Sequence, residues 1–125
     1  MRLLLDTHVL LWWLADGQTL SPTARAAIAD GSNLVAISAV SAWEISIKRA
    51  LGKLSVPDDL EYQITANGFV ALPITISDGL AAGGLPRHHD DPFDRMLVAQ
   101  AQAESLTVVT RDARFAHYDI DVLRA

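Results

Sequence analysis

Four acidic residues occupy places from which carboxylates can cooperate in one site: Asp6, Glu44, Asp94 and Asp112. Asp6 directly follows a short apolar run, and Asp112 comes two residues after another. Glu44 and Asp94 each fall in the apolar stripe of an expected helix, since their neighbours three and four positions away include apolar residues. All four are therefore expected at the ends of strands or on the core side of helices, and not on a freely solvated face.

Each of these acids also has a purely structural explanation. Asp6 could cap the following helix, and Ser41 with Glu44 has the spacing of a capping box. Asp94 would favour the N-terminus of its helix, and Asp112 fits a turn. No single acid therefore decides between a structural and a chemical role.

The four acids matter as a group, because the expected topology brings them together. In an open parallel sheet, ligand sites form beyond the carboxyl ends of the strands, and right-handed crossovers return each helix start to that edge. Four carboxylates there would repel one another by about 1 to 4 kcal/mol for each close pair. A positive partner is therefore expected among them. Because the chain has no cysteine, that partner is best a hard divalent cation, Mg²⁺ or Mn²⁺.

The four histidines are weaker candidates as metal ligands. His88 and His89 are adjacent in an expected loop and lack the spacing of a histidine metal motif, so we expect them to contact solvent or substrate. His8 and His117 are isolated in the sequence and are expected to be structural.

The elements that must position these residues alternate between strands and helices. Short apolar runs predict four strands, at 3–5, 34–37, 69–72 and 106–110, and a weak fifth strand is expected around Val122 and Leu123. Helices are expected between the strands, at about 9–15, 22–30, 38–51, 57–67 and 77–82, and from 92 onward. This alternation predicts an α/β fold with a mainly parallel sheet.

Two helix starts are well marked in the sequence. Ser21 followed by Pro22, and Asp91 followed by Pro92, each place a capping side chain before a proline at the first helical position. The second of these starts puts Asp94 in the first turn of its helix. Gly68 is expected to end the helix that precedes the third strand.

The composition indicates one domain, 1–125, with a well-filled core. The chain has 125 residues, of which half are hydrophobic. Its lack of cysteine excludes disulfides, thiolate metal sites and a thiol nucleophile. A formal net charge of −5 argues against a broad basic face for nucleic acid. Basic residues gather instead in the C-terminal third, beside two of the acids, which suits an acidic site with a basic rim.

No targeting or membrane segment is expected. The apolar start of the chain is interrupted by Asp6 after three leucines and has no small-residue cleavage site, unlike a signal peptide. No run approaches the ~20 apolar residues of a membrane span. We therefore expect a cytoplasmic protein without a membrane partner.

Four segments together carry a family resemblance: LLDTH at 4–8, SAVSAWEI at 38–45, DPFDRMLVAQA at 91–101 and VTRDARF at 109–115. In their order and spacing they resemble the PIN-domain ribonucleases along the entire chain, and most closely the VapC toxins of bacterial toxin–antitoxin pairs. The resemblance implies a three-layer α/β/α PIN-like domain with a mainly parallel sheet of four to five strands.

The resemblance also implies roles for particular residues. The acids that match Asp6, Glu44 and Asp94 hold the metal in that family, and the acid that matches Asp112 usually completes the site. A hydroxyl residue, here Thr7 or Thr110, helps to position a ligand or water. All the acidic positions are retained, so an intact Mg²⁺ site is expected, with Mn²⁺ as the alternative ion.

The activity implied is that of a Mg²⁺-dependent endoribonuclease, the toxin of a type II VapBC-like pair. Water is the nucleophile in this family, so the products carry a 3′-hydroxyl and a 5′-phosphate. The residues expected to hold the RNA backbone are all basic or imidazole side chains: Arg95, Arg111, Arg114, His88 and His89.

The implied partners are a second copy of the chain and a small antitoxin protein, with a heterotetramer or larger assembly when the antitoxin is bound. The segment 10–14 is more apolar than one helix face needs. Most of it is expected in the core, and either Trp12 or Trp13 could line a groove for a partner helix.

Three other interpretations compete with the toxin. A PIN-type nuclease of RNA maturation or of DNA flaps would carry the same acids, although the small size and the lack of appended nucleic-acid modules favour a toxin. A phospho-accepting receiver module needs a lysine after its last-but-one strand, whereas the only lysines here are Lys48 and Lys53, beside Glu44. A catalytically inactive interaction domain would tolerate loss of the acids.

Overall fold

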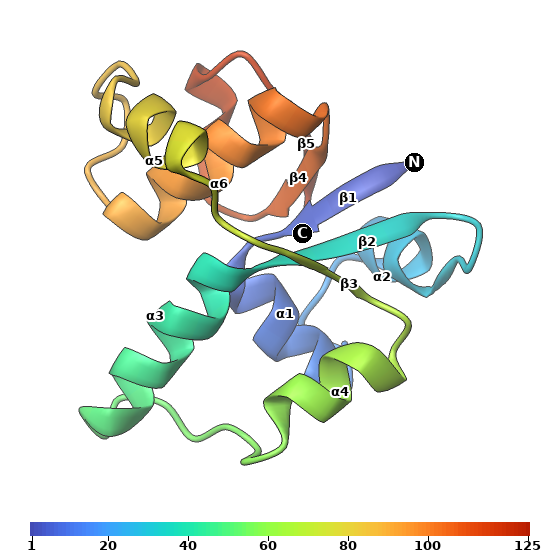
Figure 1. Cartoon of the computed structure of the whole chain (residues 1–125). Coiled ribbons are helices and arrows are strands. Elements are labelled where there is room, and N and C mark those ends of the chain that lie inside the picture. The colour runs from blue at the N-terminus through green and yellow to red at the C-terminus, as the bar shows by residue number, and fades with distance from the viewer.

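Strands and helices alternate along the chain in the computed structural model, which describes all residues, 1–125 (Figure 1). The strands are β1 (Arg2–Leu5), β2 (Leu34–Ser38), β3 (Val70–Leu72), β4 (Thr107–Thr110) and β5 (Asp121–Arg124). The helices are α1 (Thr7–Leu14), α2 (Pro22–Ala29), α3 (Ala39–Ala50), α4 (Leu60–Ala66), α5 (Ile76–Gly83) and α6 (Pro92–Glu104), with a 3₁₀ helix η1 (Ala113–His117).

The five strands form one sheet in the order β3-β2-β1-β4-β5, and every neighbouring pair is parallel. The predicted α/β class is confirmed, and the weak fifth strand pairs with β4 along its whole length. No helix of the structure has the length and apolar character to cross a membrane.

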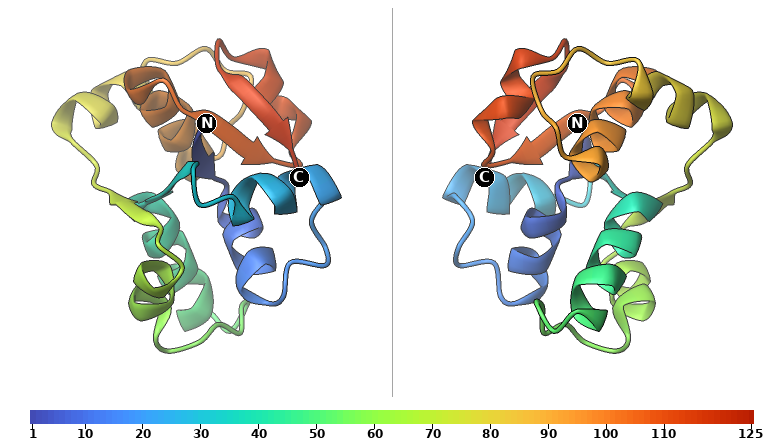
Figure 2. Two further views of the ribbon diagram at one scale, coloured as in Figure 1. Left: turned by 90° about the vertical axis from the view of Figure 1, so that its right-hand side faces the viewer. Right: turned by 90° about the vertical axis from the view of Figure 1, so that its left-hand side faces the viewer.

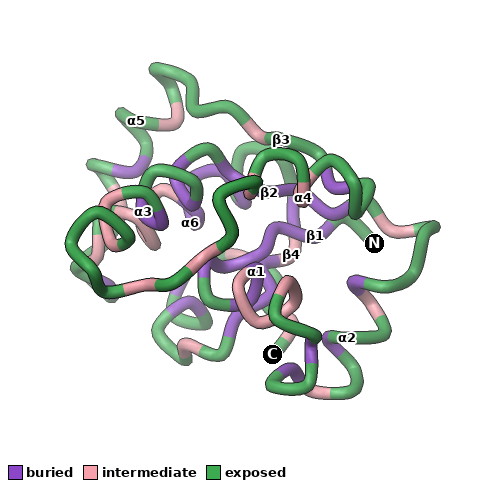
Figure 3. Tube along the Cα trace, turned by 90° about the horizontal axis from the view of Figure 1, so that it is seen from below, coloured by how far each residue is buried: buried purple, intermediate pink, exposed green.

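Helices cover both faces of the sheet, which gives the predicted three layers (Figures 1 and 2). Alternate residues of a strand point to opposite faces. Leu3 and Leu5 of β1 accordingly pack in a core cluster with α1, α2 and α4. Leu4, between them, packs in a second cluster with α6. All three leucines are fully buried, and the central strands form the buried interior of the molecule (Figure 3).

The helix starts follow local chemistry. The Ser21 hydroxyl accepts a hydrogen bond from the Ala24 backbone N–H, which caps α2 as predicted. The start of α3 differs from the proposed capping box, because Ser38 and not Ser41 is its N-cap. The Glu44 carboxylate is therefore not used for capping.

The position of β1 explains why a site forms beside it. β1 lies between β2 and β4: the chain runs from β1 through β2 to β3 on one side of β1, and then crosses to β4 and β5 on the other side. Such a reversal of strand order opens a crevice at the carboxyl ends of the strands. Asp6 follows β1 at this edge, and Thr110 ends the adjacent strand β4.

Candidate active site

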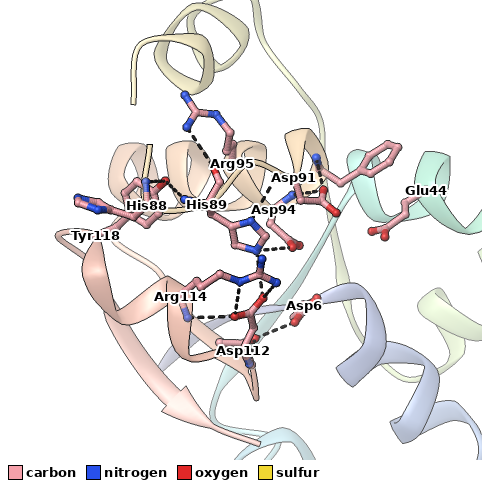
Figure 4. A network of polar contacts seen from close by, with 12 residues as sticks. Asp6, Glu44, His88, His89, Asp91, Asp94, Arg95, Asp112, Arg114 and Tyr118 are labelled. Carbon is pink, nitrogen blue, oxygen red and sulfur yellow. Dashed lines mark hydrogen bonds and ion pairs between the residues drawn. The ribbon is translucent and has the colours of Figure 1, made fainter. Parts of the chain in front are cut away.

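Four carboxylates meet at the carboxyl edge of the sheet, as the sequence predicted, and we call them the acidic cluster: Asp6, Glu44, Asp94 and Asp112 (Figure 4). Asp6 comes from the end of β1, Glu44 from α3, Asp94 from the first turn of α6 and Asp112 from the segment after β4. Their burial is unusual for acids. Asp6 and Glu44 are only 7% and 3% exposed, and the side chains of Asp94 and Asp112 are 15% and 23% exposed.

Asp6 is held by a threonine and does not cap a helix. Its carboxylate makes no capping hydrogen bond to α1, although it stands at the N-cap position. Thr110 donates its hydroxyl to Asp6 Oδ2 at 2.7 Å and accepts the Asp112 backbone N–H at 3.0 Å. Burial raises the pKa of Asp6, while the Thr110 hydrogen bond opposes that rise. Thr7, the other hydroxyl candidate, instead donates to Ser41 Oγ at 3.0 Å.

Glu44 has one paired oxygen and one without a partner. Its Oε2 lies 2.5 Å from Lys48 Nζ, one helical turn further along α3. Its Oε1 is buried and has no hydrogen-bond partner. A buried carboxylate oxygen without a donor is costly, so this atom is available to a cation.

Asp94 experiences the charge of the whole cluster. Burial is the largest cause that raises the pKa of Asp94 from 3.8 to about 8, and the negative charges of Asp6, Asp91, Glu44 and Asp112 contribute to the same rise in that order of size. Asp94 therefore carries a proton at neutral pH when no cation balances the cluster. Its Oδ2 lies 2.9 Å from His89 Nε2 and makes no helix-capping hydrogen bond.

Asp112 forms an ion pair with Arg114. Arg114 Nη2 lies 2.8 Å from its Oδ2, and the Arg114 backbone N–H donates to its Oδ1 at 2.9 Å, which caps η1. The Arg114 guanidinium lowers the pKa of Asp112 to about 2. Asp112 thus fills the turn role and also stays ionised beside the other three acids.

These donors fit a hard divalent cation. All four ligand candidates offer carboxylate oxygens, and one of these oxygens, Glu44 Oε1, is buried without a hydrogen-bond partner. The chain has no cysteine that could offer a thiolate ligand. Asp94 also shares a group of close potential ligand atoms with His89 and Asp112, whose atoms lie within 4.8 Å of one another. The fit rests on the convergence of the acids from four different elements.

The structure corrects the role expected for His89. The residue is 3% exposed, and its ring lies between Asp94 and Asp112, so it is not available to contact RNA. His88, its neighbour, is exposed and packs its ring against Tyr118 with centroids 5.1 Å apart. Only His88 of this pair stays a candidate for RNA contact.

The structure also corrects the roles expected for two arginines. The two terminal nitrogens of Arg95 donate to the backbone carbonyls of five residues: Ala82, Gly83, Leu85, Pro86 and His89. Arg95 therefore holds the loop between α5 and α6. Arg111 donates to the carbonyls of Thr19 and Ala125 and stacks over Trp12 at 4.5 Å, so it fixes the end of the chain. Arg114, 58% exposed in its side chain, keeps its place on the rim of the acidic cluster.

The sequence did not predict two contacts of the acidic cluster: the pairing of Lys48 with Glu44, and the position of the buried His89 ring between Asp94 and Asp112. Lys48 could have been found, because it lies four residues after Glu44 on the same helix, the usual spacing of an ion pair. The bridging position of His89 has no local signal, since it depends on Asp112, 23 residues away.

The tryptophan pair packs mainly into the core, as expected for most of that segment. Trp12 and Trp13 are half-buried and join the core cluster that lies between the sheet and α1 and α2. Trp13 donates its indole N–H to Asn67 Oδ1 at 3.0 Å and packs against Phe69.

Known proteins are similar to this chain in sequence or in fold. The PIN domain family model matches residues 3–121. Ribonuclease VapC22 of Mycobacterium tuberculosis is 34% identical over 114 residues, which cover 89% of this chain and 87% of the relative. VapBC2 of Rickettsia felis, solved with a DNA fragment from its promoter, matches with a TM-score of 0.71 at 16% identity, over 99% of this chain and 98% of that chain. DNA-bound VapBC of Salmonella typhimurium matches over the same shares with a TM-score of 0.69 at 17% identity.

Proposed function

The chain belongs to the PIN-domain family, and because its four acids meet at one edge of the sheet, we propose that it is a metal-dependent endoribonuclease. The observation that carries the proposal is the acidic cluster itself, with a raised pKa at Asp94 and a buried Glu44 oxygen that no donor satisfies. Such a cluster is unfavourable without a cation and suited to one. The ribonuclease name of its VapC22 relative supports RNA as the substrate.

The proposed ion is Mg²⁺, with Mn²⁺ as the alternative, and Asp6, Glu44, Asp94 and Asp112 would hold it. Both ions prefer carboxylate and water oxygens, which matches the donors present. When bound, a divalent cation supplies positive charge that polarises a phosphodiester and makes a water molecule more acidic.

The residues of the chain prepare this chemistry by fixing the acids in place. Thr110 orients Asp6 through its hydroxyl and Asp112 through the backbone N–H of that residue. Lys48 balances one oxygen of Glu44 at the rim of the cluster. Arg114 lies beside Asp112 with more than half of its side chain exposed, so it is placed to meet a phosphate of the RNA backbone. Attack by water then leaves a 3′-hydroxyl and a 5′-phosphate.

The proposed biological role is the toxin of a VapBC-like toxin–antitoxin pair, with an antitoxin and a second copy of the chain as partners. The resemblance to VapBC complexes in fold and to VapC22 in sequence supports this role. Large apolar side chains on the surface also support protein partners, since Ile76, Leu80 and Trp43 are 85%, 76% and 60% exposed. Light scattering of the purified chain should give twice its 13.5 kDa mass.

RNA cleavage with matched variants tests the proposal. Glu44→Gln removes one charge inside the acidic cluster, and Glu104→Gln makes the same change on an exposed side chain at the far end of α6. We expect the wild type and Glu104→Gln to cleave a mixed pool of transfer and ribosomal RNA with Mg²⁺ or Mn²⁺, and chelator to stop both. The cleavage rate of Glu44→Gln should be lower than that of the wild type by about 100-fold or more. Cleavage at the wild-type rate in chelator, or by Glu44→Gln, would contradict the proposal.

A further inference from the structure

His89 is fixed in the loop before α6 by contacts on every side. Its side chain is only 1% exposed, and its ring meets Phe115 edge to face with centroids 5.8 Å apart. Its backbone N–H donates to the Tyr118 hydroxyl at 3.0 Å, and its carbonyl accepts from Arg95 at 3.2 Å. The ring therefore has one orientation available to it.

The hydrogen bond at Nδ1 fixes where the ring carries its proton. The Asp91 backbone N–H donates to His89 Nδ1 at 3.2 Å. A backbone amide can only donate, so Nδ1 must accept and carries no proton. The neutral ring then has its proton on Nε2. Asp91 is itself held, because its carboxylate caps α6 through the N–H groups of Phe93 and Asp94.

Nε2 lies next to two members of the acidic cluster, and its proton is donated to one of them, Asp112. Nε2 lies 2.9 Å from Asp94 Oδ2 and 3.0 Å from Asp112 Oδ2 (Figure 4). These two acids belong to segments that are far apart in the chain, the first turn of α6 and the residues after β4. His89 is the side chain that joins them.

We propose that His89 is a positioning residue of the metal site and not a metal ligand: its fixed Nε2–H donates to Asp112, and the buried ring keeps Asp112 beside Asp94 for the cation. Ligation through Nε2 would need a free electron pair there, and the proton would have to move to Nδ1, where it would meet the Asp91 N–H. The role rests on the proposed function, since it assumes that the two acids bind a cation. It also explains why a histidine among the acids leaves an oxygen-only site suited to Mg²⁺ or Mn²⁺.

Two variants separate positioning from ligation. His89→Phe keeps an aromatic ring against Phe115 and removes the donor, whereas His89→Gln supplies an amide N–H donor. Binding of Mn²⁺ alone to the full chain, measured by calorimetry, should weaken about 10- to 100-fold in His89→Phe. Most of the affinity should return in His89→Gln. His117→Phe, which removes an exposed histidine outside the cluster, should bind as the wild type does.

Imidazole nitrogen NMR of the wild type provides a test that needs no variant. We expect the His89 Nε2 proton to persist when the diamagnetic ion Mg²⁺ is added. Its loss on Mg²⁺ binding, or equal weakening of Mn²⁺ binding in the Phe and Gln variants, would make His89 a ligand and overturn the inference. Unchanged Mn²⁺ binding in His89→Phe would overturn it as well. Failure of the wild type to bind Mn²⁺ would instead overturn the proposed function on which it rests.

Discussion

Replacing Asp94 with asparagine should stabilise the metal-free protein, which is the reverse of what a structural capping role predicts. Burial and four neighbouring acids raise the pKa of Asp94 from 3.8 to about 8. At pH 7 the unfolded chain ionises this side chain, while the folded chain keeps it protonated. The roughly three pH units between 3.8 and 7, at about 1.36 kcal/mol each, correspond to about 4 kcal/mol of lost stability.

Asparagine removes this loss and keeps the shape of the side chain. It has no charge, and its amide oxygen can take the place of Asp94 Oδ2, which lies 2.9 Å from His89 Nε2. We expect the free energy of unfolding of Asp94→Asn to exceed that of the wild type by about 2 to 4 kcal/mol at pH 7 in chelator. For a domain of this size, that corresponds to a melting temperature higher by roughly 6 to 15 °C.

The stability difference between Asp94→Asn and the wild type should depend on pH. Below pH 3.8 both folded and unfolded wild type protonate Asp94, so its destabilising effect is absent there. The effect grows as pH rises from 3.8 towards 8, and the advantage of the variant should grow with it. Urea denaturation in chelator at pH 4, 5.5 and 7 measures this trend.

A control and a refuting result complete the test. Asp119→Asn makes the same change on an exposed acid and should alter stability by no more than about 0.5 kcal/mol. Added Mg²⁺ should stabilise the wild type and Asp119→Asn, and Asp94→Asn much less. If Asp94→Asn were as stable as the wild type or less stable at pH 7 in chelator, the acidic cluster would not be under electrostatic strain and the reasoning would be refuted.

Three further substitutions test other parts of the site. Thr110→Val removes the hydroxyl bound to Asp6 and should weaken Mn²⁺ affinity about 10- to 100-fold in calorimetry. Thr110→Ser keeps the hydroxyl and should keep the affinity. Equal losses of affinity in both variants would contradict the positioning role of Thr110. Lys48→Met leaves the buried carboxylate of Glu44 unpaired and should lower the free energy of unfolding of the metal-free protein by about 1 to 3 kcal/mol. Added Mg²⁺ should restore much of this stability. An unchanged melting temperature in the metal-free variant would refute a stabilising role of the Lys48–Glu44 pair. The lysine of Arg95→Lys cannot reach the same loop carbonyls, so the variant should have a lower melting temperature and an unchanged salt dependence of RNA binding. A shallower salt dependence in the variant would indicate that Arg95 contacts RNA.

The sequence predicted the elements because their signals are local. The cap at Ser21 and the cap at Asp91 depend on side chains within three residues of the helix start, and both are present in the structure. The runs 3–5 and 106–110 predicted strands that the structure confirms, with each start shifted by one residue and each end unchanged. The meeting of the four acids followed from one topological rule about parallel strands, which the sheet obeys.

The residues around the acids were harder to predict, because their roles depend on distant partners. The type of Arg95 and Arg111 suggested contact with RNA, yet both donate to backbone carbonyls between 6 and 92 residues away in the chain. A guanidinium has five donors, and sequence does not show which carbonyls lie within its reach. The burial of His89 could not be predicted either, because it depends on Phe115 and Tyr118, which follow β4.

Anomalous diffraction from crystals soaked in Mn²⁺ tests the central claim, that the four acids together hold the catalytic cation. We expect an anomalous peak among the carboxylate oxygens of Asp6, Glu44 and Asp94, beside Asp112, at oxygen distances of about 2.0 to 2.2 Å. His89 Nε2 should lie outside ligand distance of that peak. Absence of a peak at saturating Mn²⁺, or a peak only at other residues, would contradict the account.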